Sequence, residues 1–162
     1  MTPIRAVQDL IHLDMDAIKA YEQAIKACDH ETVAAQLRSF QGDHQRHVND
    51  LSEELRKLGE QPDVRTDIKG FFIEAFTAVT AHGTKSALLA MRGNETLTTA
   101  RYKAALDLQD LPDSTKEVIR KNYADEQRHL QWIKMALDQK IWEQPQPGEK
   151  AQPGEPTQPG QS

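Results

Sequence analysis

Two side chains with the chemistry to bind a metal ion lie three residues apart in the segment 122–137, NYADEQRHLQWIKMAL. They are Glu126 and His129, and an ideal helix places both on one stripe with Ile119 and Ile133. A stripe of this kind is normally apolar and faces the core of the protein. A carboxylate and an imidazole at this spacing form the Glu-x-x-His pattern of metal sites inside helical bundles.

Three further segments carry polar residues on stripes that are otherwise apolar and have helical spacing. These residues are Asp14 and Tyr21 in 3–28, His44 and His47 in 32–58, and Glu95 and Tyr102 in 84–108. The four segments therefore predict four amphipathic helices, each with chemically active side chains at the middle of its buried face.

The spacing of these residues indicates an internal duplication. Asp14 precedes His44 by 30 residues, and Glu95 precedes Glu126 by 31 residues. In both halves a tyrosine also follows the first carboxylate by seven residues, at position 21 or 102. We interpret the chain as two divergent copies of one helical hairpin.

Burial of these groups requires compensation, because an unpaired buried carboxylate costs several kcal/mol and a typical domain is stable by only about 5–15 kcal/mol. A bound metal ion is the most economical compensation for three carboxylates that face one core. The six candidate metal ligands are Asp14, His44, His47, Glu95, Glu126 and His129.

The second helix departs from the usual ligand pattern of a dinuclear bundle. His44 stands where a glutamate is expected, so the set has three carboxylates and three imidazoles, with one carboxylate bridge fewer. Asp43 is adjacent but points about 100° away on an ideal helix. Asp16 and Glu22 are alternative ligands from the first helix, because each is a small shift from the predicted stripe.

Composition and charge exclude several classes of protein. The 162 residues are 38% hydrophobic and 28% charged, which is typical of one globular domain. The net charge of −5 shows no basic footprint for nucleic acid or anionic membrane, and no apolar run is long enough to span a bilayer. The N-terminal segment lacks a secretory signal, so we expect a cytoplasmic protein. The single cysteine, Cys28, lies on an apolar stripe, which predicts an inert buried thiol.

Capping residues and helix breakers set the expected boundaries. Thr2 and Pro3 predict the start of the first helix, and the segment 29–31 separates it from the second. A short apolar helix over 68–81 is expected to cover one end or side of the bundle and to end at His82 and Gly83. A capping box over 114–117 predicts the start of the last helix, which should continue to about residue 140.

The last twenty residues have a different composition. From about residue 143 the chain contains repeated Gln, Pro and Gly, with no hydrophobic residue to anchor a core. We therefore expect a folded domain over 1–141 and a disordered tail over 142–162.

The folded part resembles the ferritin-like superfamily, which includes rubrerythrin and bacterioferritin, and is most similar to an uncharacterised bacterial family of ferritin-like four-helix-bundle proteins. The segments that carry this resemblance are DMDAIKAYEQAI, FQGDHQRHVNDLSEELRKLG, KGFFIEAFTAV, and GNETLTTARYKAAL followed by NYADEQRHLQWI. The resemblance implies an all-α antiparallel four-helix bundle with a crossover between the second and third helices. It also implies a di-iron site that oxidises Fe(II) or reduces oxygen or peroxide.

Three functional hypotheses follow. The first is a di-iron oxidoreductase involved in iron handling or stress response, with manganese or zinc as alternative metals and with Tyr21 or Tyr102 supplying a proton or an electron. The second is a metal-free stress-response bundle that acts by association, with the six groups in a hydrogen-bonded network and the segment 71–79 as a dimer surface. The third is a mononuclear zinc or iron site formed by His47, Glu126 and His129.

Overall fold

The computed structural model describes residues 1–64 and 71–146, with side chains for 1–64 and 83–146. Its elements are α1 (Pro3–Ala27), α2 (Glu31–Lys57), α3 (Phe71–Leu106), α4 (Asp113–Asp138) and a 3₁₀ turn, η1 (Ile141–Glu143). The described residues contain no strand, so the predicted all-α class is confirmed.

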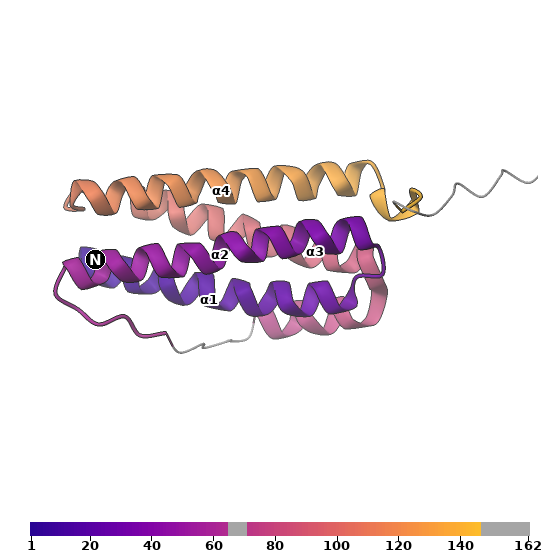
Figure 1. The fold of residues 1–162 in the computed structure, drawn as a ribbon, viewed down its shortest axis with the longest axis horizontal. Helices are drawn as coiled ribbons and strands as arrows, with labels where there is room; N and C mark the ends of the chain where they lie inside the picture. Colours follow the sequence, from indigo (N-terminus) through magenta and orange to yellow (C-terminus); the bar gives the residue numbers. More distant parts are fainter. Residues whose placement is uncertain (65–70, 147–162) are drawn as a thin grey trace, which may run out of the picture.

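The four helices form an elongated bundle in which neighbouring helices run antiparallel (Figure 1). α1 packs along α2 and α3, and α4 packs along α3 and less extensively along α2. α2 and the second part of α3 therefore run in the same direction on opposite corners of the bundle (Figure 1). Each of the four helices faces the centre with one stripe, as their periodicity predicts.

The start of α1 follows the sequence prediction, whereas the start of α4 does not. The hydroxyl of Thr2 accepts a hydrogen bond from the amide of Arg5 at 3.2 Å, and Pro3 is the first helical residue. α4 begins at Asp113 without a side-chain cap. The predicted capping box is wrong because the hydroxyl of Ser114 donates instead to the buried carboxylate of Glu54, at 2.8 Å. This contact ties the end of α2 to the start of α4.

A sharp bend at Gly83 divides α3 into two parts. Its φ of 77° and ψ of −154° lie in a region that is essentially accessible only to glycine. The bend lies where the short apolar helix is predicted to end. The start of that helix at residue 68 and the side chains that would cover the bundle lie outside the described residues, so its covering role stays a prediction.

Two hydrophobic clusters stabilise the bundle, one on each side of its middle. The cluster nearer the end of α1 includes Tyr21, Phe40 and Met91, all fully buried. The cluster nearer the start of α1 includes Ile11 and Leu51. The six predicted metal ligands lie between these two apolar layers, which hold the helices in register around them.

The beginning of the predicted tail contacts the bundle. The ring Nε2 of His30 lies 3.1 Å from the carbonyl oxygen of Gln144, and the side chain of Gln146 accepts a hydrogen bond from the amide of Glu31 at 2.8 Å. Residues 141–146 therefore pack beside the α1–α2 connection, and residues 147–162 lie outside the described part. In that connection Cys28 is only partly buried, rather than buried as expected, and its thiol lies 3.3 Å from the carbonyl oxygen of His30.

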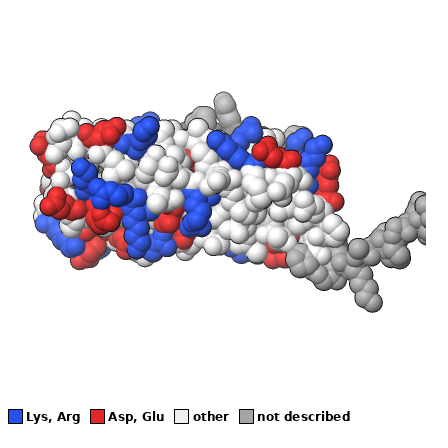
Figure 2. Space-filling view, turned by 90° about the horizontal axis from the view of Figure 1, so that it is seen from above, with Lys and Arg blue, Asp and Glu red and all other residues white. Residues whose placement is uncertain are grey.

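The surface carries charges of both signs. Figure 2 shows residues of both signs mixed together on the face that includes α4, most densely over one half of it, without a large area of one sign. Across the described ranges, none of the helices combines the length and the apolar character needed to span a bilayer.

Candidate metal centre

The six residues predicted as metal ligands converge at the middle of the bundle. Each of them has no solvent-exposed surface. α1 contributes Asp14, α2 contributes His44 and His47, α3 contributes Glu95, and α4 contributes Glu126 and His129. Their donor atoms form two groups compact enough to hold an ion, and both groups include His44 and Glu126.

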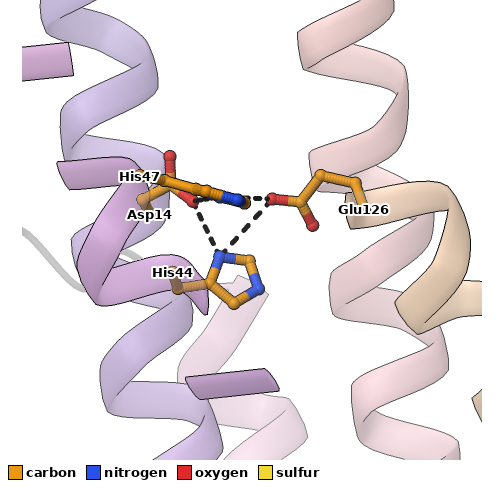
Figure 3. Close-up of side chains that lie close together, drawn as sticks. All are labelled: Asp14, His44, His47 and Glu126. Atoms are coloured by element: carbon orange, nitrogen blue, oxygen red, sulfur yellow. Dashed lines mark hydrogen bonds and ion pairs between the residues drawn. The ribbon is translucent and has the colours of Figure 1, made fainter. Parts of the chain in front are cut away.

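The first position is formed by Asp14, His44, His47 and Glu126 (Figure 3). The Nδ1 atoms of His44 and His47 lie 2.7 and 3.1 Å from Oδ1 of Asp14. The same two nitrogens lie 3.5 and 3.3 Å from Oε1 of Glu126, which approaches from the opposite side. In a tetrahedral site with metal–ligand distances near 2.1 Å, neighbouring donor atoms are about 3.4 Å apart. The spacing within the first position is therefore close to that of a metal site.

The second position is formed by His44, Glu95, Glu126 and His129. Oε1 of Glu95 lies 3.0 Å from Nε2 of His44 and 3.3 Å from Nδ1 of His129. Oε2 of Glu126 lies 3.8 Å from Nδ1 of His129. His44 thus directs one ring nitrogen to each position, and Glu126 directs one carboxylate oxygen to each.

The two buried tyrosines connect the halves of the chain. Tyr21 of α1 donates a hydrogen bond to Oε1 of Glu95 on α3. Tyr102 of α3 donates to Oδ2 of Asp14 on α1. The tyrosines are bonded to ligand carboxylates, and each is bonded to the carboxylate of the other half. This exchange is the arrangement expected for two copies of one helical hairpin.

Asp43 and Asp125 complete the histidine environment, and the sequence interpretation did not assign them this role. Nε2 of His129 lies 2.7 Å from Oδ2 of Asp43, and Nε2 of His47 lies 2.9 Å from Oδ2 of Asp125. A carboxylate at the outer nitrogen fixes the orientation of the ring and makes the inner nitrogen a better ligand. The signal that could have identified these residues is the repeated pentapeptide DHQRH at 43–47 and DEQRH at 125–129.

Two arginines from the same repeated pentapeptide cover this side of the centre. Arg46 forms ion pairs with Asp43, at 3.1 Å, and with Asp125. Arg128 lies 2.7 Å from Asp43 and 3.3 Å from Asp125. Both guanidinium groups are partly exposed, whereas the histidines beneath them are fully buried. The ion pairs therefore separate the centre from solvent between α2 and α4.

Burial and ion pairing act in opposite directions on the pKa values of the histidines. Burial lowers the pKa of His47, but hydrogen bonds to Asp125 and Asp14 outweigh it and raise this pKa to about 10. For His129, hydrogen bonds to Glu126 and Glu95 likewise outweigh burial and raise the pKa to about 9. The pKa of His44 is also raised well above its ordinary value, because the charges of Glu126 and Glu95 outweigh burial. Without metal, all three imidazoles therefore carry protons at neutral pH.

The pKa values of the three carboxylates shift in different directions. Burial raises the pKa of Asp14, but hydrogen bonds from His44 and His47 more than offset this, and the pKa is lowered. The pKa of Glu95 is also lowered, and that of Glu126 is raised, first by burial and then by the charge of Glu95. Buried tyrosine hydroxyls beside carboxylates have raised pKa values as well, so Tyr21 and Tyr102 stay protonated donors.

Among the six candidate ligands, one carboxylate oxygen lacks a hydrogen-bond partner. Oε1 of Glu126 accepts no hydrogen bond, although Nδ1 of His44 and Nδ1 of His47 are 3.5 and 3.3 Å away. Leaving a buried carboxylate oxygen unsatisfied costs about 1–3 kcal/mol or more. A cation between this oxygen and the two nitrogens would remove that cost, so these residues fit a metal ion.

The structure also distinguishes among the alternatives left open by the sequence. Asp14, and neither Asp16 nor Glu22, belongs to the two donor groups. Neither of these groups of described residues contains both His47 and His129, which does not favour a mononuclear site built from those two histidines and Glu126.

Comparison with known proteins gives a family without an assigned activity. No curated protein and no solved structure matches the chain. The family match covers α1 and α2 and extends through α3, and thus includes Asp14, His44, His47 and Glu95. It extends over residues 2–108, more than half of the chain, and the chain therefore belongs to the family described as a domain of unknown function (DUF2383).

Proposed function

We propose that this protein is a ferritin-like metal protein that binds two iron ions at the middle of its bundle and oxidises Fe(II) or reduces oxygen or peroxide. The observation that carries the proposal is the unpartnered buried Oε1 of Glu126, which faces two imidazole nitrogens at 3.3 and 3.5 Å. Two adjacent groups of donor atoms, rather than one, favour two ions.

The donor set favours a first-row transition metal over magnesium or calcium. Imidazole nitrogens suit iron and zinc, whereas sites formed only by oxygen suit magnesium and calcium. Three carboxylates provide the charge to stabilise an oxidised ion, and iron when bound would supply the electron that reduces oxygen or peroxide. Manganese and zinc are alternative metals for the same residues.

The protein residues would have separate tasks in this reaction. Asp14, Glu95 and Glu126 would hold the ions together with the three histidines, and the apolar layers on both sides would exclude bulk water. Tyr21 and Tyr102 would hold protons on their hydroxyl oxygens, beside Glu95 and Asp14. Their raised pKa values keep both hydroxyls protonated, so Tyr21 and Tyr102 would remain hydrogen-bond donors that orient these two carboxylates.

An anaerobic Fe(II) titration of protein freed of metal tests this proposal. We expect saturation at two irons per chain and, after air is admitted, a near-ultraviolet ferric band that develops faster than in buffer. Glu126→Ala should lose both. Glu117→Ala is the matched control, because Glu117 is an exposed glutamate of the same helix. Binding that is equal in both variants, or absent from the native protein, would contradict a metal function.

A metal-free function is the second candidate, and the charge balance at the centre favours it. Three protonated imidazoles lie among three carboxylates, and their mutual contacts neutralise the network without an ion. Such a bundle would act by association, with a dimer as the simplest assembly. In that case Glu126→Gln should leave the free energy of unfolding unchanged or raise it, and no metal should copurify with the protein.

A further inference from the structure

Hydroxyl groups contact the carboxylate oxygens of the second ion position but not those of the first. At the first position, Oδ1 of Asp14 accepts only from imidazoles, because Tyr102 donates to the other oxygen, Oδ2. Oε1 of Glu126 accepts from no group at all. Both oxygens of the first position are therefore free of hydroxyl donors.

At the second position, both carboxylates are engaged by hydroxyl groups. Tyr21 donates to Oε1 of Glu95, the same oxygen that faces the two histidines of this position. The hydroxyl of Thr98 lies 3.0 Å from Oε2 of Glu126 and 3.1 Å from Oε2 of Glu95, and 3.2 Å from the carbonyl of Glu95. An ion at the second position must displace or share these hydrogen bonds in a buried site, where they are strongest.

We infer that the two positions differ in affinity, that the first position binds its ion more tightly, and that Tyr21 and Thr98 are the residues that weaken the second. This inference rests on the proposed metal binding and specifies its order. A hydrogen bond to a charged group contributes about 1.5–3 kcal/mol, so the second ion should bind at least about tenfold more weakly than the first. The chain would then hold one ion tightly and exchange the other.

Cobalt(II) is a suitable probe because its visible spectrum reports binding independently of any activity. Calorimetry and visible absorption of the full chain, titrated anaerobically, should show two steps of different affinity. His47→Ala should remove the tight step, because His47 belongs only to the first position, and His129→Ala should remove the weak step. Loss of the tight step in His129→Ala instead would overturn the order proposed here.

Near-isosteric variants test the two hydroxyl groups separately. Tyr21→Phe and Thr98→Val should each tighten the second step about tenfold relative to the first. Tyr123→Phe is the matched control, because its hydroxyl accepts a hydrogen bond from Gln127 at the surface of α4, so it should leave the second step unchanged. Two variants with independent substitutions keep the test informative if one of them fails to fold.

The failures of the two proposals are distinguishable. Two cobalt ions that bind the native chain in a single step of equal affinity would overturn the inequality and leave the metal function intact. If neither hydroxyl variant changes the second step, the role assigned to Tyr21 and Thr98 is overturned, and the metal function again remains intact. Absence of cobalt binding to the native chain would overturn the metal function and this inference together.

Discussion

Nε2 of His129 lies 2.7 Å from Oδ2 of Asp43, although the two residues are 86 positions apart in the chain. The equivalent contact of the other half joins His47 and Asp125. In each pair, one residue comes from α2 and the other from α4. Each of these two helices therefore orients a histidine ligand of the other. The geometry of the centre thus depends on the register of these two helices.

Removing the charge of either aspartate should weaken metal binding. In Asp43→Asn and Asp125→Asn the ring nitrogen loses its ionised partner, and we expect the affinity to fall about 10- to 100-fold. Calorimetric titration with cobalt(II) measures this effect. Asp138→Asn, an exposed aspartate at the end of α4, is the control and should bind as the native protein does. Unchanged affinity in Asp43→Asn would show that the contact does not support the ligand.

The metal-free protein should lose stability at alkaline pH. The pKa values of His47 and His129, about 10 and about 9, exceed the unfolded value near 6.5, so the folded state binds these protons more tightly. This stabilisation is complete below about pH 6.5 and disappears as the pH rises through 9 to 10. Urea unfolding of chelator-treated protein should show a falling midpoint over this range, and His129→Gln should flatten the curve. A midpoint that rises with pH would contradict this.

The bend at Gly83 should not tolerate a side chain. Its φ of 77° with ψ of −154° is strained for any other residue, and Gly83→Ala should lower the free energy of unfolding by about 1–3 kcal/mol. Gly93→Ala is a matched control within the helical part of α3, where an added methyl group meets no atom within 4 Å. There, alanine should stabilise the protein by about 0.4–1 kcal/mol. Chemical denaturation of both variants measures the two changes in the free energy of unfolding. Equal changes would contradict a strained backbone at Gly83.

Core packing can be tested at a leucine of the cluster near the start of α1. Leu51 is fully buried, and Leu51→Ala should destabilise the protein by about 2–5 kcal/mol because it removes buried apolar surface and leaves a cavity. Leu89 is 40% exposed, and Leu89→Ala should change stability by no more than about 0.5 kcal/mol. Thermal unfolding of the two variants and the native protein measures these changes in stability. A small effect at Leu51 would mean that the helices do not pack as described.

Local sequence patterns were sufficient to predict the helices and the six residues at the middle of the bundle. Hydrophobic periodicity identifies the buried stripe of each helix, and a polar residue on that stripe must face the core wherever the helix packs. For this reason Asp14, Glu95 and Glu126 could be assigned before their surroundings were known. The match in spacing between the two halves supported the same assignment.

Which atoms contact one another depends on how the helices pack in three dimensions. The partners of Asp43, Asp125 and the two tyrosines lie on other helices, and their pairing depends on helix register and rotation, which local periodicity does not define. The contact of Ser114 with Glu54 replaced the predicted cap for the same reason, since a hydroxyl next to a buried carboxylate donates there instead. The difference between the two ion positions likewise depends on which oxygen of a carboxylate accepts a hydrogen bond from a hydroxyl group. Side-chain packing in the folded protein determines this.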